Sequence, residues 1–146
     1  LLKLLKDYHA PYLAVIFDAA RANFRNEIYP AYKANRIETP EDLKPQFPLV
    51  RAATTAFDIP AIELEGYEAD DLIAAYTRLA LEKGKTVTIV SSDKDLMQLI
   101  RPGVRILDPM KNVFCGEAEV LEKFGVPPEK VVDVQALAGD STDNVP

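Results

Sequence analysis

Short apolar runs and longer amphipathic stretches alternate along the 146 residues. Residues 13–17 (LAVIF) and Val87–Val90 (VTIV) are continuous apolar runs, the form expected for strands buried on both faces of a parallel sheet. Weaker strands are predicted at residues 61–64 and 104–107, and residues 112–115 are predicted to pair as a short edge strand.

Helical periodicity fills the intervals between these strands. An apolar stripe of helical period precedes Gly84, which ends it, and comprises Ala69, Leu72, Ile73, Tyr76 and Leu79. Further helices are predicted at residues 40–57, 95–100, 117–124 and 128–138, and residues 1–10 form a partial amphipathic helix that is too short and too charged to span a membrane. Alternating strands and helices predict an α/β fold with a mainly parallel central sheet flanked by helices.

Charge changes this picture, because positive and negative residues are segregated. The chain carries a formal net charge of −6, yet residues 21–37 contain four basic residues and one acid, a local charge of +3. This basic stretch has no clean period and is predicted to be a long functional loop or a marginal helix.

The 48% apolar content suits one domain with a core. Cys115 is the only cysteine, which excludes an internal disulfide and fits a reducing cytoplasm.

Acidic residues gather where the predicted strands end and the next helices begin. Such positions meet at the carboxyl edge of a parallel sheet, where α/β folds bind ligands. Eight carboxylates in four clusters occupy them: Asp18; Glu68, Asp70 and Asp71; Asp93 and Asp95; Asp140 and Asp143.

Two interpretations of these acids remain open when each cluster is taken singly. Acids in a first helical turn favour the helix dipole, and an Asp can cap a turn. Taken together, the clusters would repel one another without positive compensation, and Lys94 is the only base interleaved among them. Oxygen ligands without His or Cys favour Mg²⁺, with Mn²⁺ as a substitute, and eight acids exceed the needs of one ion. Two or more metal ions and phosphoryl displacement by water are therefore predicted.

The basic stretch complements such a site, since cations neutralise the phosphates next to a cleaved bond. Tyr29 and Tyr32 lie among these cations and can either stack on exposed bases or pack against the domain. A receiver-like signalling module with one Mg²⁺ is an alternative, but it needs only about three acids and leaves the basic stretch unexplained. A DNA- and metal-binding module without activity is the second alternative.

Five motifs resemble the 5′-nuclease family of bacterial DNA polymerase I, within the flap endonuclease superfamily. They are VIFDA (15–19), FRNEIYPAYKANR (24–36), GYEADD (66–71), SSDKD (91–95) and GDSTDNVP (139–146). The resemblance implies a resolvase-like three-layer fold with a basic helical arch. It implies that the eight carboxylates bind metal directly or through water, that Lys33 and Arg36 act catalytically at the scissile phosphate, and that DNA is contacted by Arg21, Arg25, Tyr32, Lys33 and Arg36.

The resemblance also implies a biological setting. We expect a bacterial, nucleoid-associated, monomeric nuclease that acts on 5′ flaps or 5′ ends of duplex DNA in replication and repair, linked to a C-terminal polymerase domain of the same chain. The family begins with a strand carrying a further metal-binding Asp and continues into a helix-hairpin-helix element, and both are absent from these 146 residues. Residues 1–146 are thus predicted to be a fragment of the catalytic domain that is inactive alone.

Overall fold

The computed structural model describes residues 1–20 and 22–146. Within them, strands β1 (Val15–Ile16) and β2 (Ala61–Ile62) form one parallel pair. Strands β3 (Val87–Val90) and β4 (Val104–Asp108) form a second parallel pair, to which β5 (Val113–Cys115) adds an antiparallel edge. The predicted parallel pairing and the edge strand are confirmed. The prediction of one central sheet is wrong, because the strands form two small sheets.

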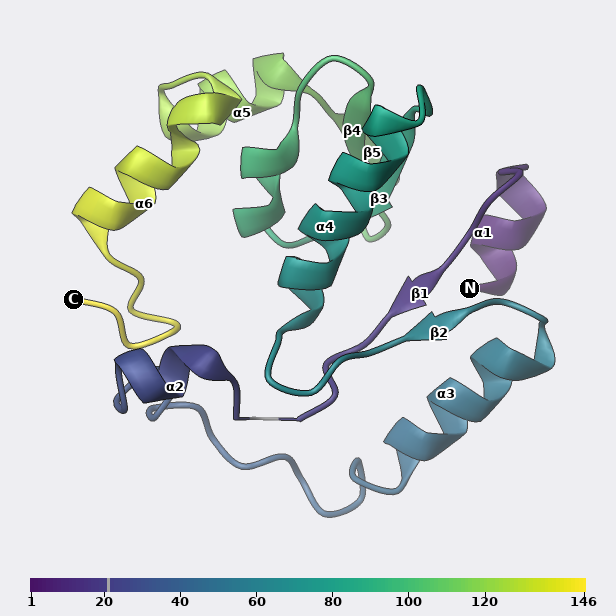
Figure 1. Cartoon of the computed structure of the whole chain (residues 1–146), viewed down its shortest axis with the longest axis horizontal. Coiled ribbons are helices and arrows are strands. Elements are labelled where there is room, and N and C mark those ends of the chain that lie inside the picture. Colours follow the sequence, from purple (N-terminus) through teal and green to yellow (C-terminus); the bar gives the residue numbers. More distant parts are fainter. Residues whose placement is uncertain (21) are drawn as a thin grey trace.

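Burial also differs from the prediction. Both residues of β1 are half-buried, and β3 buries Ile89 while Val90 is 38% exposed. Helix α4 (Ala69–Glu82) contacts both β1 and β3, and Figure 1 shows the β1–β2 pair on one side of this helix and the β3–β5 sheet on the other. An apolar run predicts a strand, but tertiary contacts choose its neighbour and decide how much of each face is covered.

The remaining helices follow the predicted segments with shifted ends. They are α1 (Leu2–Asp7), α2 (Phe24–Ile28), α3 (Gln46–Ala56), η1 (Asp95–Leu99), α5 (Glu117–Phe124), η2 (Pro128–Lys130) and α6 (Val131–Ala138). Helix α3 begins after Pro45 rather than at residue 40, because a proline disfavours helical geometry at the residue before it. The segment predicted as a loop or marginal helix contains the short α2 followed by turns. No helix among residues 1–20 and 22–146 is long and apolar enough to cross a membrane.

Helix α4 turns a different face to the core than its apolar stripe suggests. Thr77 is 4% exposed, whereas Tyr76 and Leu79 are 47% and 43% exposed. Ile73 and Leu81 pack against the core, so the buried face follows a line through these two residues and Thr77.

The core lies in the second half of the chain and anchors the elements that carry the acidic motifs. Its buried members come from β3, η1, β4, α5 and the start of α6, and are Ile89, Leu96, Met97, Ile100, Val104, Ile106, Val120 and Val131. Residues 139–146, which we term the closing loop, follow α6 and run back to α2 (Figure 1). Two backbone carbonyls of the closing loop accept hydrogen bonds from the basic stretch. The Asp143 carbonyl accepts the backbone N–H of Lys33 at 2.9 Å, and the Ser141 carbonyl accepts the side-chain amide of Asn35 at 2.8 Å. Residues far apart in sequence thereby meet at one site.

Candidate metal and nucleic-acid site

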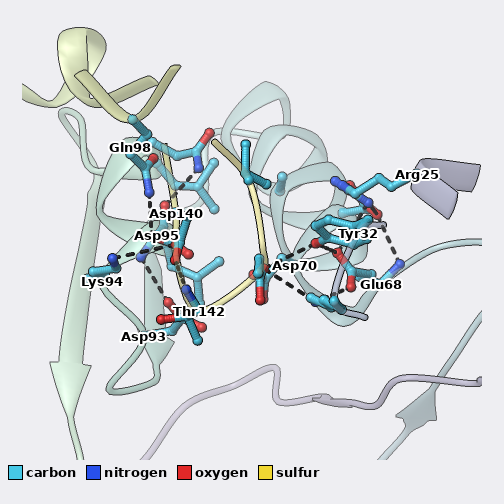
Figure 2. A pocket seen from close by; sticks show the side chains of 18 of the residues that line it. Arg25, Tyr32, Glu68, Asp70, Asp93, Lys94, Asp95, Gln98, Asp140 and Thr142 are labelled. Atoms are coloured by element: carbon cyan, nitrogen blue, oxygen red, sulfur yellow. Dashed lines mark hydrogen bonds and ion pairs between the residues drawn. The ribbon is translucent and has the colours of Figure 1, made fainter. Parts of the chain in front are cut away.

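A cavity of about 420 Å³ lies between α4, η1, the closing loop and residues 23–36, which we term the basic segment. Figure 2 shows acidic side chains from three of these elements facing one another across it. Seven of the eight predicted metal ligands line the cavity: Glu68, Asp70, Asp71, Asp93, Asp95, Asp140 and Asp143. Four cations also line it, namely Arg25, Lys33, Arg36 and Lys94, so the formal charge of the lining is −3.

On the α2 side of the cavity, Arg25 holds the first turn of α4. Its guanidinium donates two hydrogen bonds to the Asp71 carboxylate, at 2.8 and 2.7 Å, and lies 3.3 Å from Glu68. Asp71 also accepts the Glu68 backbone N–H at 2.9 Å, so it caps its own helix. The hydrogen bonds from Arg25 lower the pKa of Asp71. Capping and cation pairing therefore account for Asp71 in this structure, as the local interpretation of the sequence allowed.

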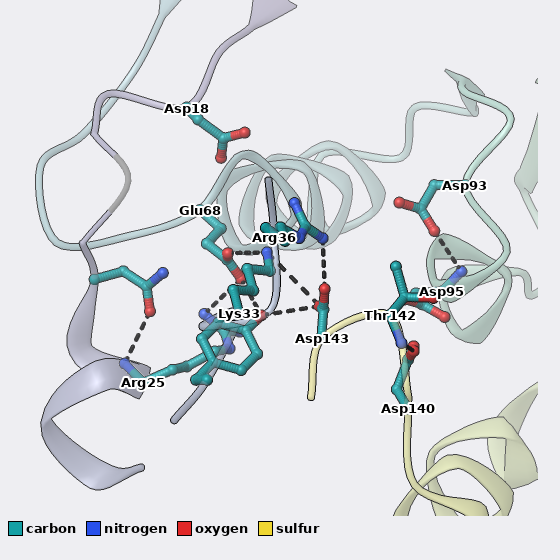
Figure 3. A network of polar contacts seen from close by, with 12 residues as sticks. Asp18, Arg25, Lys33, Arg36, Glu68, Asp93, Asp95, Asp140, Thr142 and Asp143 are labelled. Atoms are coloured by element: carbon teal, nitrogen blue, oxygen red, sulfur yellow. Dashed lines mark hydrogen bonds and ion pairs between the residues drawn. The ribbon is translucent and has the colours of Figure 1, made fainter. Parts of the chain in front are cut away.

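The rest of the basic segment pairs with Glu68 and Asp143. The Lys33 ammonium contacts the Glu68 carboxylate and lies 3.7 Å from Asp143, and the Arg36 guanidinium lies 2.5 Å from Asp143 (Figure 3). The Tyr32 hydroxyl donates to Glu68 at 2.8 Å and lies 3.3 Å from Asp143. Burial, followed by the hydrogen bond to Glu68, raises the pKa of Tyr32. The cations predicted to contact phosphate are thus partners of predicted metal ligands.

Lys33 occupies an unusual backbone conformation. Its φ of 57° lies in the left-handed region, which costs a residue with a Cβ about 1–2 kcal/mol. The hydrogen bond from its N–H to the Asp143 carbonyl fixes this turn and directs the side chain toward Glu68. The closing loop therefore helps to place Lys33 in the cavity.

The η1 side of the cavity is less compensated. Asp93 accepts the Asp95 backbone N–H at 2.9 Å, Lys94 lies 3.6 Å from Asp140, and the Gln135 amide of α6 donates to the Asp95 carboxylate. Burial, and then the charge of Asp93, raise the pKa of Asp95. Neutral donors and one distant lysine leave these three acids with most of their negative charge.

Asp70 lies between the two sides and forms no hydrogen bond or ion pair with another side chain of residues 1–20 and 22–146. Burial, followed by repulsion from Asp93 and Glu68, raises its pKa from 3.8 to about 6. A half-buried acid without a cationic partner is a natural ligand for a bound cation.

Asp18 does not line the cavity. Its carboxylate accepts the Ala69 backbone N–H at 2.8 Å, at the start of α4, and Arg51 donates to its backbone carbonyl at 2.8 Å. Figure 3 shows Asp18 across the start of α4 from Asp93. Asp18 thus lies near the start of α4 and acts there as a cap, and its role as a metal ligand stays a prediction.

The donor chemistry of the cavity fits hard divalent cations, because its potential ligands are carboxylate oxygens. In the part of the chain that the structure describes, no three acidic, His or Cys side chains converge closely enough to enclose one ion. Cations of the basic segment lie against three of these acids, Glu68, Asp71 and Asp143. Direct ligation by all eight acids stays a prediction.

Sequence reasoning missed the residues that organise the cavity. Gln135, Asn35 and Asn144 bridge segments that lie 40, 106 and 113 positions apart. Asn35 and Asn144 belong to two of the motifs, but neither they nor Gln135 were predicted to have this role. Arg21, predicted to contact DNA, lies outside the described residues. Arg25, Tyr32, Lys33 and Arg36 are all brought to the cavity.

Comparison with known proteins identifies the class to which this fold and cavity belong. Residues 1–125 match the family described as the 5′-3′ exonuclease, N-terminal resolvase-like domain, and the chain belongs to this family. Among its relatives are a DNA polymerase I of Rhizobium leguminosarum, 59% identical over 92% of this chain and 13% of that protein, and a 5′-3′ exonuclease of Aquifex aeolicus, 42% identical over the whole chain and 50% of that protein. The chain therefore spans at most half the length of these relatives, and family membership excludes the receiver-like alternative.

Solved structures give the same fold. A T5 protein co-crystallised with metal ions superposes with a TM-score of 0.83 at 27% identity, covering 98% of this chain and 58% of that one. A bacteriophage T5 flap endonuclease in a pseudo-enzyme–product complex with DNA and metal ions superposes with a TM-score of 0.81 at 26% identity, covering 98% of this chain and 57% of that one. The predicted α/β resolvase-like class is confirmed.

Proposed function

We propose that this chain is the catalytic part of a divalent-metal-dependent 5′-nuclease that hydrolyses DNA phosphodiesters at 5′ ends and 5′ flaps. The observation that carries the proposal is the cavity in which seven carboxylates from three acidic motifs face three cations of the basic segment. Family membership and the DNA- and metal-bound T5 neighbour support it.

Mg²⁺ is the proposed ion, with two or more bound and Mn²⁺ as a substitute, because the donor set consists of carboxylates. Bound ions of this kind activate water and offset the charge of a transferring phosphoryl group. Asp70, Asp93, Asp95 and Asp140 are the best-placed ligands, since no cation lies within 3.5 Å of them among the described residues. Glu68 and Asp143 would join them by giving up Lys33 and Arg36, while Asp18 and Asp71 would act through water.

This exchange assigns a role to the basic segment. Lys33 and Arg36, once separated from Glu68 and Asp143, are positioned to contact the scissile phosphate from the same cavity. Preorganised cations at that point stabilise the charge that develops in the transition state. Arg25 holds the α4 start through Asp71 and offers a further phosphate contact, and the Tyr32 ring is available to stack on a base, with Lys33 4.9 Å from its centroid.

The setting is proposed from the relatives. A DNA polymerase I and a separate 5′-3′ exonuclease both match, and both acidic residues of SSDKD and of GDSTDN are present, which favours the polymerase-linked form in a bacterial, nucleoid-associated monomer. Residues 1–146 alone should bind metal weakly and lose most cleavage, because a metal-binding strand and a duplex-gripping element are expected outside them.

The test is cleavage of a 5′-flap DNA by the full-length protein that carries this chain. We expect cleavage in Mg²⁺ that EDTA abolishes and added Mn²⁺ restores. Cleavage that continues in excess EDTA contradicts metal dependence, and DNA binding without any cleavage in Mg²⁺ or Mn²⁺ identifies a binding-only module instead.

A further inference from the structure

The η1 side of the cavity contains a contact that the proposed chemistry does not use. The Gln135 side chain of α6 reaches across to η1, lines the cavity and donates its Nε2–H to Oδ1 of Asp95, 40 positions earlier in the chain. We propose that Gln135 is a positioning residue, which orients the Asp95 carboxylate as a ligand for a divalent cation in the cavity. This inference rests on the proposed metal-dependent function.

Asp95 is held at both its backbone and its side chain. The Gln98 amide donates to the Asp95 carbonyl at 2.8 Å, and Leu96 and Met97, which follow Asp95 in η1, are 3% and 9% exposed. The backbone of Asp95 is therefore anchored in the core. Among the described residues, Gln135 is the one group that donates a hydrogen bond to its carboxylate, so Gln135 sets the direction in which that carboxylate points.

The neutrality of Gln135 is what suits it to this role. Across the cavity, Arg25, Lys33 and Arg36 hold carboxylates but also cancel their charge, so a metal ion must displace them. An amide fixes one oxygen of Asp95 and leaves the negative charge in place. Asp93 is held in a similar way, because its Oδ1 accepts the Asp95 N–H at 2.9 Å. Both acids thus present one oriented oxygen that no described residue occupies.

Partners of this kind govern metal affinity in proteins. Groups that hydrogen-bond to a ligating side chain orient it, and their loss typically weakens metal binding about 10–100-fold. Gln135 is half-buried, and α6 is anchored independently by Val131, which is fully buried. The loss of one amide bond should therefore disturb the ligand more than the fold.

The experiment measures Mn²⁺ binding to the full-length protein by calorimetry and by the electron paramagnetic resonance signal of free Mn²⁺. Gln135→Leu keeps the side-chain volume and removes the donor, and Gln135→Glu keeps the shape and places a second carboxylate against Asp95. We expect Gln135→Leu to weaken one class of Mn²⁺ site about 10–100-fold, and Gln135→Glu, which no longer donates to Asp95 but adds negative charge beside it, to change that affinity as well. Cleavage should fall at low Mg²⁺ and recover at high Mg²⁺, because the metal requirement changes rather than the chemical step.

Gln46→Leu is the matched control. Gln46 is an exposed glutamine at the start of α3, outside the cavity, and its amide donates to the Asp42 carbonyl at 3.2 Å. Loss of the Gln46 amide should leave Mn²⁺ binding unchanged. Thermal unfolding in EDTA checks the fold of each variant. If Gln135→Leu does not fold, Gln135→Asn, which is one methylene too short to reach Asp95, replaces it with the same expectation.

The outcomes distinguish a failure of the Gln135 proposal from a failure of the proposed metal-dependent function. Wild-type protein that binds no Mn²⁺ overturns the proposed function. Wild-type protein that binds Mn²⁺ while both Gln135 variants bind it with the same affinity, within about twofold, overturns the role of Gln135 alone. Weaker cleavage that high Mg²⁺ does not restore also overturns it, since the defect then lies elsewhere than in ligand positioning.

Discussion

Replacing Asp70 by asparagine should stabilise the metal-free protein while impairing metal binding. In the folded chain, burial and the neighbouring acids Asp93 and Glu68 raise the pKa of Asp70 from 3.8 to about 6. The ionised carboxylate is therefore disfavoured in the fold, and an acid with a raised pKa stabilises the fold fully below its unfolded pKa and loses that contribution as the pH rises through its folded pKa. At neutral pH, wild-type protein carries this cost and the Asp70→Asn variant does not.

The size of the effect follows from the same values. A rise of about two pKa units corresponds to about 3 kcal/mol at about 1.36 kcal/mol per unit. Because Asp70 is only half-buried and faces a polar cavity, solvent screening reduces the net effect to about 1–2 kcal/mol. We expect Asp70→Asn to raise the free energy of unfolding by that amount above pH 6, with the gain declining between pH 6 and pH 4 and absent below.

Urea unfolding in EDTA, followed by circular dichroism at pH 4, 5, 6 and 7.5, measures the difference between the two proteins. Glu82→Gln, an exposed acid at the end of α4, is the control and should show no such pH-dependent difference. Added Mn²⁺ should stabilise wild-type protein more than the variant, because the variant has lost a ligand. An Asp70→Asn variant that is less stable than wild type at pH 7.5, or whose gain is largest at pH 4, would refute the reasoning.

Substitutions at four further positions test the other parts of the site. Lys33→Ala should lower the single-turnover cleavage rate about 10²-fold at saturating enzyme, as for loss of one oxyanion donor, and an unchanged rate would leave Lys33 as a docking contact. Asp93→Ala and Asp18→Ala should both abolish cleavage, and each should cost about 1 kcal/mol of stability in EDTA because it removes the acceptor of a backbone N–H, that of Asp95 and that of Ala69 respectively. Asp18→Asn should restore stability but not cleavage, and equal stability of both Asp18 variants would contradict this cap. Tyr32→Phe removes the hydroxyl bond to Glu68 and should destabilise the protein by about 1 kcal/mol; DNA affinity measured by fluorescence anisotropy should not change, and a large loss would show that the hydroxyl rather than the ring contacts DNA.

Local chemistry in the sequence determined much of this protein. Apolar runs, helix caps and turn residues act over a few positions, so the five strands and most helices could be placed from the sequence, with ends shifted where Pro45 intervenes. The acidic motifs follow strands or open helices for the same local reason, and seven of the eight acids do meet in one cavity. The segregated charge of the basic segment likewise indicated the second half of the site.

Only the tertiary structure decided which of these groups are partners. Arg36 and Asp143 stand 107 positions apart, and Gln135 and Asp95 stand 40 apart, so no periodicity connects them. The division into two sheets and the buried face of α4 depend on packing between distant elements. The same holds for the difference between Asp71, which Arg25 neutralises, and Asp70, which forms no ion pair with any residue that the structure describes. Sequence spacing sets what a residue can do chemically. Burial and charge pairing are properties of the folded chain, and they set whether a carboxylate is a cap, an ion-pair partner or an open metal ligand.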